Sequence, residues 1–294
     1  MNRRELLKQS ALLTLFGNGL PGAFNNFAKN RIHIGACDWS IGKSSDPLAF
    51  DVAKQIGLEG IQVNMGTLAN NLHLRNKDIQ QNYRESSLRS GVKIASLALA
   101  EFNNIPYKSD PRTEEWLWDS IDTASNLDAK LILLAFFAGN DLRNDDKGKK
   151  EVIKRLKMVV SKAEKLGVIL GIESYLSAGE HMDIIQRVGS KNIRVYYDFR
   201  NSADAGHDVI KEIKWLGKDI ICELHMKENG PLLGKGTLDW NKIAETLLDM
   251  EYYGNGWMQI EGSLPENAGI VESYKHNLHF LKDCFHYKNK IFSG

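Results

Sequence analysis

The sequence of 294 residues is poor in cysteine, with three, and in proline, with six. Cys37, Cys222 and Cys284 are widely separated and odd in number, so they do not indicate a disulfide framework. No proline-rich or low-complexity segment divides the chain, and we therefore expect one large domain with a sizeable core. An oxidising location would have to be inferred from other features.

An excess of charge is also missing, since the formal net charge at pH 7 is only +1. Nucleic acids and anionic membrane surfaces bind proteins largely through positive charge, so we expect neither as a partner. The densest basic stretch, residues 147–157, is interleaved with apolar residues at helical spacing and indicates a solvated helix face. No later apolar run is long enough to span a bilayer, which predicts no stable membrane insertion.

The first residues resemble a twin-arginine export signal. The segment NRRELLK, which contains Arg3 and Arg4, precedes a modestly apolar stretch that ends near Phe24. We interpret residues 1–30 as a leader and residues 31–294 as the folded domain, exported to the periplasm with its cofactor already loaded. The alternative is an amphipathic helix with an incidental arginine pair, in a cytoplasmic protein.

From residue 32 onward, short β-rich runs alternate with longer amphipathic segments. The short runs predict strands near residues 32–38, 60–64, 92–100, 130–137, 168–173, 193–198, 219–226 and 256–261. The longer segments predict helices near residues 46–57, 76–90, 114–128, 147–166, 182–189, 206–217, 239–252 and 269–285. Such alternation predicts an α/β fold, a single (β/α)₈ TIM barrel. A doubly wound open sheet is the alternative, but no phosphate-binding GxGxxG follows the first strand.

Four of the predicted strands end in a side chain that can bind a metal ion. The strand ends and their residues are GVILGIES with Glu173, IRVYYDF with Asp198, IICELHM with His225 and WMQIEG with Glu261. Because alternate side chains of a strand point to opposite faces, each of these residues can point away from its apolar neighbours. Barrel enzymes carry their sites at the C-terminal ends of the strands. Three oxygen donors and an imidazole predict one divalent ion, with Mn²⁺, Mg²⁺ or Co²⁺ favoured and Zn²⁺ as the alternative.

From about residue 32 to 285 the sequence resembles the xylose isomerase-like barrel superfamily, often called sugar phosphate isomerase/epimerase. The matching pieces are GIES, YYDFRN, ELHMKEN, GKGTLDW and QIEGS. The resemblance implies a divalent ion held by Glu173, Asp198, His225 and Glu261. It also implies that Glu173 and Glu261 act as acid and base, moving a proton next to a carbonyl through a metal-stabilised enediolate. The predicted activity is that of a sugar isomerase or epimerase, and a homodimer is compatible with the resemblance.

Five further side chains near the strand ends are candidates for binding the substrate. They are Lys227, Glu101, Asn64, Asn201 and Trp39. Lys227 shares the inward face of its strand with the ligand histidine, so it could hold a substrate oxygen or a site carboxylate. Glu101, Asn64 and Asn201 could bind sugar hydroxyls or could equally cap the helices that follow. Trp39 could form an apolar wall against a sugar ring.

The substrate class and the reaction leave alternatives open. The segment GSLPENAG, which follows Glu261 where a barrel would bind phosphate, contains no Arg or Lys, so a non-phosphorylated keto sugar or related polyol is expected. A lyase that acts on 3-keto glycosides would use the same proton-abstracting groups. A non-catalytic carbohydrate-binding barrel of the cell envelope is the third interpretation. The similar barrel of the endonuclease IV family needs extra histidines for three zinc ions, whereas Asn64 and Glu101 end the second and third strands here.

Overall fold

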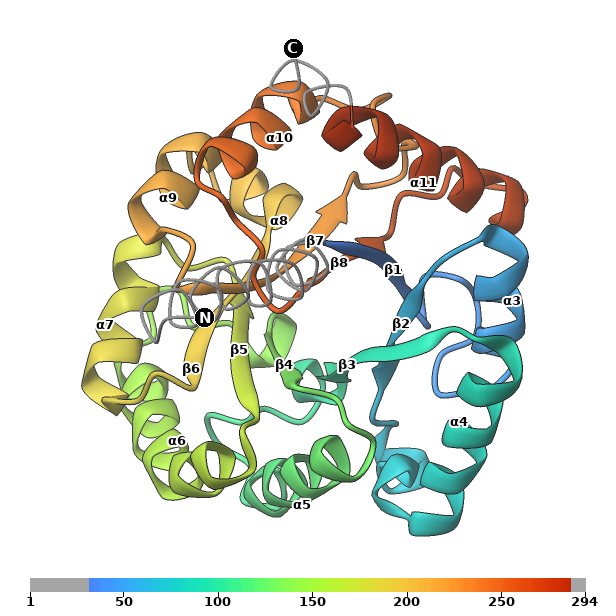
Figure 1. Cartoon of the computed structure of the whole chain (residues 1–294). Coiled ribbons are helices and arrows are strands. Elements are labelled where there is room, and N and C mark those ends of the chain that lie inside the picture. Colours follow the sequence, from blue (N-terminus) through green and yellow to red (C-terminus); the bar gives the residue numbers. More distant parts are fainter. Residues whose placement is uncertain (1–31, 287–294) are drawn as a thin grey trace, which may run out of the picture. The chain divides into compact units, whose positions relative to one another are not determined.

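The computed structural model describes residues 32–286. Within them, eight parallel strands close into a barrel, in which each strand pairs with the next along the chain and β8 pairs with β1. Helices surround the strands as an outer ring (Figure 1). The predicted (β/α)₈ TIM barrel is confirmed. The predicted leader, residues 1–30, lies outside the described residues, so it stays a prediction together with the domain boundary.

The strands occupy the predicted runs to within about two residues at each end. They are β1 His33–Cys37, β2 Gly60–Asn64, β3 Lys93–Leu99, β4 Leu131–Phe136, β5 Ile169–Ser174, β6 Ile193–Asp198, β7 Ile221–Lys227 and β8 Trp257–Glu261. Short apolar runs in the sequence marked these strands, because buried parallel strands are rich in apolar residues along their whole length.

The helices also follow the predicted order, with one addition. The α-helices are α3 Ala49–Ile56, α4 Lys77–Ser90, α5 Arg112–Asn126, α6 Asp146–Leu166, α7 Ala178–Val188, α8 Phe199–Asp204, α9 Val209–Leu216, α10 Trp240–Asp249 and α11 Ile270–His286. The described part of the chain also contains four short 3₁₀ helices, η1 Leu68–Asn70, η2 His73–Arg75, η3 Ala100–Asn103 and η4 Ala138–Asn140. The six-residue helix α8 was not predicted, because so short a segment shows no helical period. No helix within residues 32–286 is long and apolar enough to cross a bilayer.

Capping interactions explain where the helices begin and end. Gly57, Gly91 and Gly167 end α3, α4 and α6 with positive φ angles of 93°, 77° and 66°, as the sequence predicted. Asp198 caps the N-terminus of α8, since its Oδ1 accepts a hydrogen bond from the backbone N–H of Asn201 at 2.8 Å. A predicted metal ligand therefore also starts a helix, which fixes the direction of its side chain.

The strands bury one set of side chains against the helices and the other set inside the barrel. Leu170 and Ile172 of β5 and Leu224 and Met226 of β7 are fully buried. Burial of such a side chain stabilises the fold by about 1.5–3 kcal/mol relative to exposure. Successive side chains of a strand point to opposite faces. Because these apolar side chains pack against the helices, the residues that alternate with them, such as Glu173 and His225, point toward the barrel interior.

The barrel interior has an apolar side and a polar side. On the apolar side, Ala98 of β3 packs with Leu131, Leu133 and Ala135 of β4 in one hydrophobic cluster. On the polar side, buried hydrogen-bonding residues from β2, β7 and β8 fill the space; they are Gln62, Glu223 and Gln259. Small residues make room for them: a Cβ at Gly35 would come within 2.3 Å of Gln259 Oε1.

Candidate metal centre

Four neighbouring strands, β5 to β8, bring the predicted ligands to one point at the C-terminal end of the barrel. Asp198 of β6 is the register partner of His225 of β7, and Glu261 of β8 is the register partner of Lys227. One potential ligand atom from each of Glu173, Asp198, His225 and Glu261 lies within 4.8 Å of all the others. The order of the strands around the barrel therefore converts four distant sequence positions into one cluster.

His225 lies at the centre of this cluster and is fully buried. Its Nδ1 is 2.9 Å from Glu173 Oε1, 3.3 Å from Glu261 Oε2 and 3.8 Å from Asp198 Oδ2. Burial of the ring opposes its protonation, but the charges of Glu261 and Glu173 outweigh this and raise the pKa of His225 to about 9. In the absence of a metal ion, the imidazolium is thus the cation that these carboxylates hold.

Lys227 adds a second positive group at the edge of the cluster. Its Nζ is 3.0 Å from Glu261 Oε2, 3.5 Å from Asp198 Oδ2 and 3.3 Å from Asn201 Oδ1. Burial acts to raise the pKa of Glu261, but His225 and Lys227 together lower it to about 2. Burial raises the pKa of Asp198 to about 7 against the opposing effect of Lys227.

Two of the remaining candidates, Trp39 and Asn201, hold the site carboxylates. Trp39 Nε1 donates a hydrogen bond to Glu261 Oε1 at 2.9 Å. The side-chain amide of Asn201 donates to Glu173 Oε1 at 3.4 Å, while its backbone N–H binds Asp198. Both side chains therefore orient carboxylates, a contact that the sequence did not predict for either of them.

The donor set fits a divalent cation. Asp198 Oδ2 and Glu261 Oε2 are buried, and neither has a hydrogen bond of good geometry within residues 32–286; their contacts with His225 and Lys227 are ionic. Buried carboxylate oxygens normally accept hydrogen bonds or bind cations. Three carboxylates with an imidazole nitrogen suit a six-coordinate ion such as Mn²⁺, Mg²⁺ or Co²⁺, with positions left for substrate oxygens.

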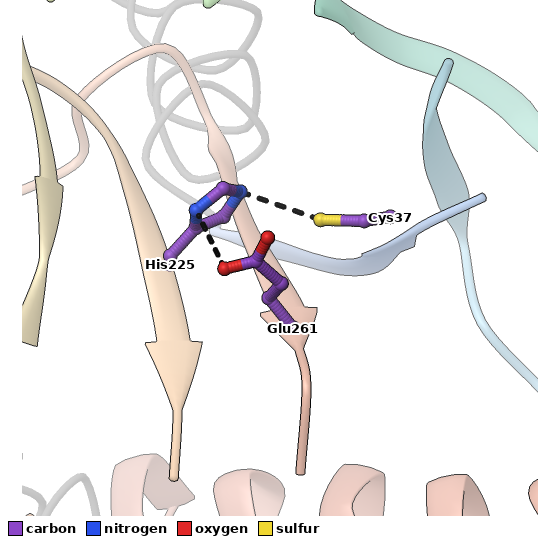
Figure 2. A group of neighbouring side chains, drawn as sticks. All are labelled: Cys37, His225 and Glu261. Atoms are coloured by element: carbon purple, nitrogen blue, oxygen red, sulfur yellow. Dashed lines mark hydrogen bonds and ion pairs between the residues drawn. The ribbon is translucent and has the colours of Figure 1, made fainter. Parts of the chain in front are cut away.

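Cys37 of β1 forms a second possible donor group with His225 and Glu261. Figure 2 shows that Cys37 and Glu261 approach opposite nitrogens of the imidazole ring. Cys37 Sγ is 3.3 Å from Nε2, whereas Glu261 Oε2 is 3.3 Å from Nδ1. An ion bound at Nδ1 with the carboxylates is therefore on the far side of the ring from Cys37. Burial also raises the pKa of the Cys37 thiol, which disfavours the thiolate that a metal requires.

A cavity of about 390 Å³ opens directly above the cluster, a volume within the range of about 300–1,000 Å³ for small-molecule sites. Its charged side is formed by Glu173, Glu261 and Lys227. Its apolar side is formed by Ala100, Leu133, Ala135, Phe137, Trp39 and Tyr175. Among the described residues that line it, Lys227 is the only Lys or Arg.

Asn64 and Glu101 occupy different positions relative to this cavity. Asn64 lines it, although its Oδ1 already accepts from the Gly66 N–H and its Nδ2 donates to Ser44. Glu101 is buried beside η3 and does not line the cavity; its Oε1 accepts from the Leu68 N–H and its Oε2 from Asn104. Glu101 therefore connects η3 to the start of η1 and does not cap the helix that follows it, and its role as a substrate-binding residue stays a prediction.

Sequence reasoning did not assign a role to Gln62, Glu223 or Phe137. Phe137 and Tyr175 form an edge-to-face pair at the cavity wall, with ring centroids 4.8 Å apart. Gln62 and Glu223 lie inside the barrel below His225. The available signal was strand parity, because Gln62 shares a face with Asn64, and Glu223 with His225.

The chain is thus a closed parallel barrel that gathers three carboxylates and a histidine beneath a cavity at the C-terminal ends of its strands, which is where TIM-barrel enzymes carry their active sites. The family model described as xylose isomerase-like TIM barrel matches residues 50–284, and the chain belongs to this family.

Two curated relatives and one solved structure show what the chain is similar to, all at low sequence identity. A 2-epi-5-epi-valiolone 7-phosphate 2-epimerase of Actinoplanes sp. is 24% identical over 214 residues, covering 69% of this chain and 77% of the relative. A D-psicose 3-epimerase of Enterocloster bolteae is 27% identical over 128 residues, covering 40% of this chain and 42% of the relative. The crystal structure of D-psicose 3-epimerase with D-tagatose from Clostridium cellulolyticum H10 has a TM-score of 0.74 at 17% identity, covering 86% of this chain and 99% of the other.

Proposed function

We propose that the protein is a divalent-metal-dependent sugar epimerase or isomerase. The observation that carries this proposal is the convergence of four ligand atoms within 4.8 Å, where two buried carboxylate oxygens lack good hydrogen bonds, at the floor of a cavity. The curated relatives that act as sugar epimerases support it. Glu173, Asp198, His225 and Glu261 would hold the ion, which when bound polarises a substrate carbonyl and makes the neighbouring C–H more acidic.

The two glutamates would carry the proton transfer. Glu173 and Glu261 both line the cavity and come from β5 and β8, with the intervening strands β6 and β7 between them. A sugar bound between them would lose a proton from one face to one carboxylate and receive a proton on the other face from the second carboxylate. The net result is inversion at that carbon with no net loss of protons. Return of the proton to the adjacent carbon would instead interconvert an aldose and a ketose.

The chemistry of the cavity supports a non-phosphorylated keto sugar or related polyol as substrate. Lys227 is the only Lys or Arg among the described lining residues, and it already pairs with Glu261 and Asp198. A phosphate bound here would therefore lie near several carboxylates without a free cation to neutralise it. The apolar side of the cavity suits the C–H face of a sugar ring.

The test of the proposal is exchange of solvent deuterium into a panel of keto sugars in the presence of Mn²⁺. Wild-type protein is expected to label one sugar at a single carbon, and Glu173→Gln and Glu261→Gln are each expected to slow that labelling by about 10²–10⁴-fold. Glu180→Gln serves as the matched control, because Glu180 caps α7 and lies outside the cavity. Near wild-type labelling by both site variants would contradict the proposal.

The same experiment separates the two alternatives. A lyase on 3-keto glycosides would release the leaving group and yield an unsaturated product, which mass spectrometry detects. A non-catalytic carbohydrate-binding barrel would bind a sugar tightly in calorimetry without any deuterium entering it. The identical proton-abstracting groups would serve the lyase, so only the product distinguishes it from the epimerase.

We also propose export to the periplasm by the twin-arginine route, on the basis of Arg3 and Arg4 in the leader-like segment. Cell fractionation of wild type and an Arg3→Lys, Arg4→Lys double variant tests this. Retention of the variant in the cytoplasm is expected, whereas an equal cytoplasmic location of both proteins would favour the cytoplasmic alternative. Homodimer formation stays a prediction that size-exclusion chromatography with light scattering can check.

A further inference from the structure

The ring nitrogen of His225 that faces away from the carboxylates has a partner of its own. His225 Nε2 is 3.0 Å from Gln62 Oε1, on the opposite side of the barrel interior. Cys37 Sγ is 3.3 Å from the same nitrogen, but its S–H donates to Gln62 Oε1 at 3.4 Å. A carbonyl oxygen only accepts hydrogen bonds, so Nε2 must carry a proton to make this contact. In the metal-free imidazolium Nδ1 carries the second proton; an ion that displaced this proton would leave Nε2–H in place and would bind the lone pair of Nδ1, the nitrogen that faces Glu173 and Glu261.

The orientation of the Gln62 amide is itself fixed by a chain of hydrogen bonds. Its Nε2 donates to Ser96 Oγ at 3.0 Å and to the Tyr196 hydroxyl at 3.1 Å. Both hydroxyls then direct their own protons to Glu223 Oε1, at 2.7 Å from Ser96 and 3.1 Å from Tyr196. A flipped amide would place its oxygen against these hydroxyls and its NH₂ group against His225, which would need the opposite tautomer.

Glu223 is the last group in this series of hydrogen bonds, and its carboxylate only accepts them. Its Oε1 also accepts from Gln259 at 3.0 Å, and its Oε2 accepts from Asn255 at 3.2 Å. Burial raises the pKa of Glu223, and the hydrogen bonds from Ser96, Gln259 and Asn255 oppose this rise. As a carboxylate it accepts from all four donors, which leaves each hydroxyl a single direction in which to donate. The direction of every hydrogen bond from Glu223 to His225 is therefore set.

We propose that Gln62 and Glu223 are positioning residues, which hold the His225 proton on Nε2 and so present the Nδ1 lone pair to the carboxylate cluster. The inference rests on the proposed metal centre, because an exposed Nδ1 lone pair is what an ion held by Glu173, Asp198 and Glu261 would need. Partners of this kind orient a ligand histidine and raise its affinity for metal, typically by 10–100-fold, as an order of magnitude.

The test compares Gln62→Leu and Glu223→Gln with wild type, and uses Gln80→Leu as the matched control. Gln80 is an equally buried amide, but it lies on α4 and contacts Leu74 and Thr123 rather than the barrel interior. Calorimetric titration with Mn²⁺ is expected to show binding about 10–100-fold weaker in both site variants. The control is expected to lose stability while its Mn²⁺ affinity stays within about twofold of wild type.

A second measurement observes the Nε2 proton without any metal. ¹H–¹⁵N NMR of the metal-free protein detects the Nε2–H of His225, and the hydrogen bond to Gln62 slows exchange of this proton with solvent. Wild type and Gln80→Leu are expected to show a slowly exchanging Nε2–H, and the two site variants a rapidly exchanging one. Glu223→Gln differs from wild type by one atom, which keeps the test usable if Gln62→Leu does not fold.

The outcomes separate the two proposals. Unchanged Mn²⁺ affinity and unchanged exchange of the Nε2 proton in both folded site variants would overturn the positioning role and leave the metal centre standing. A wild-type protein that binds no Mn²⁺, while the variants still exchange the Nε2 proton faster, would support the positioning role and overturn the metal centre.

Discussion

The two sides of the barrel interior contrast sharply in chemistry although they are built from the same kind of strand. The ends of β5 to β8 carry three carboxylates, His225 and Lys227, which ion pairs join directly. The ends of β3 and β4 carry Leu133, Ala135 and other apolar side chains that line the same cavity. The border is abrupt, because Ala135 of β4 is the register partner of Glu173 of β5.

This difference assigns separate tasks to the two sides. In the proposed function the charged side would hold the ion and move protons, since opposite charges in a buried site interact strongly. The side chains of the apolar side offer no carboxylate or imidazole that would compete for the ion. Substitutions on the charged side should therefore change metal binding and turnover, whereas substitutions on the apolar side should change only the fit of the substrate.

The largest effect is expected from removing a ligand on the charged side. Asp198→Ala and His225→Ala should lower the metal content of purified protein from about one divalent ion per chain to near zero, because each leaves the ion without a strand-end donor. Inductively coupled plasma mass spectrometry measures this directly. Asp183→Ala and His276→Ala, which lie outside the cluster, should keep the ion. Loss of metal in these controls, or retention in both ligand variants, would argue against the four-residue site.

Removal of the ammonium group of Lys227 should shift metal binding along the pH axis. Burial acts to raise the pKa of Glu261, but His225 and Lys227 hold it at about 2. The side chain of Glu261 therefore becomes protonated only when the pH falls through that value. In Lys227→Met the pKa of Glu261 rises, and Mn²⁺ affinity at about pH 5 should fall about tenfold, with no loss at about pH 8. The surface variant Lys211→Met is the control. If the Mn²⁺ affinity of Lys227→Met changed with pH in the same way as that of Lys211→Met, the expected role of Lys227 would be contradicted.

A larger side chain on the apolar side should affect the substrate alone. Ala135→Leu extends into the cavity beside Glu173 and should raise KM for the sugar about fivefold, by the overpacking of a well-filled wall. Metal content should stay at the wild-type level. Ala135→Ser is the matched control, since it adds one oxygen atom, and steady-state kinetics should find its KM within about twofold of wild type. A loss of metal in Ala135→Leu would show that the two sides are coupled.

The smallest effect concerns a buried histidine whose hydrogen-bond partners are neutral groups instead of carboxylates. His181 binds Ser174 Oγ and the Ser177 carbonyl, and burial lowers its pKa to about 4, whereas that of His225 rises. Its folded-state pKa lies below the unfolded value, so its contribution to stability is complete above about pH 6.5 and is lost as the pH falls toward 4. Between about pH 8 and pH 5.5 this amounts to about 1 kcal/mol. In His181→Gln, urea unfolding should show a free energy of unfolding that changes by that much less between these two pH values. The same pH dependence in the variant and in wild type would contradict the assigned contribution of His181.

The sequence alone located most of the fold because the signals are local. Apolar runs marked β1 to β8, and the glycines after α3, α4 and α6 marked the helix ends. Parity along each strand also determined that Glu173, Asp198, His225 and Glu261 share the inward face. These properties depend on neighbours within a few residues, so a single sequence displays them.

The contacts between strands that are far apart in sequence depend on closure of the barrel. The hydrogen bond of Trp39 to Glu261, the contact of His225 with Gln62, and the border between Ala135 and Glu173 each depend on the register of strands that are far apart in sequence. The helix α8, which Asp198 caps, was too short to show a period. Strand parity was thus enough to predict which side chains point inward. Which of them come into contact became known from the closed barrel, because distances across a barrel depend on strand register and closure rather than on local periodicity.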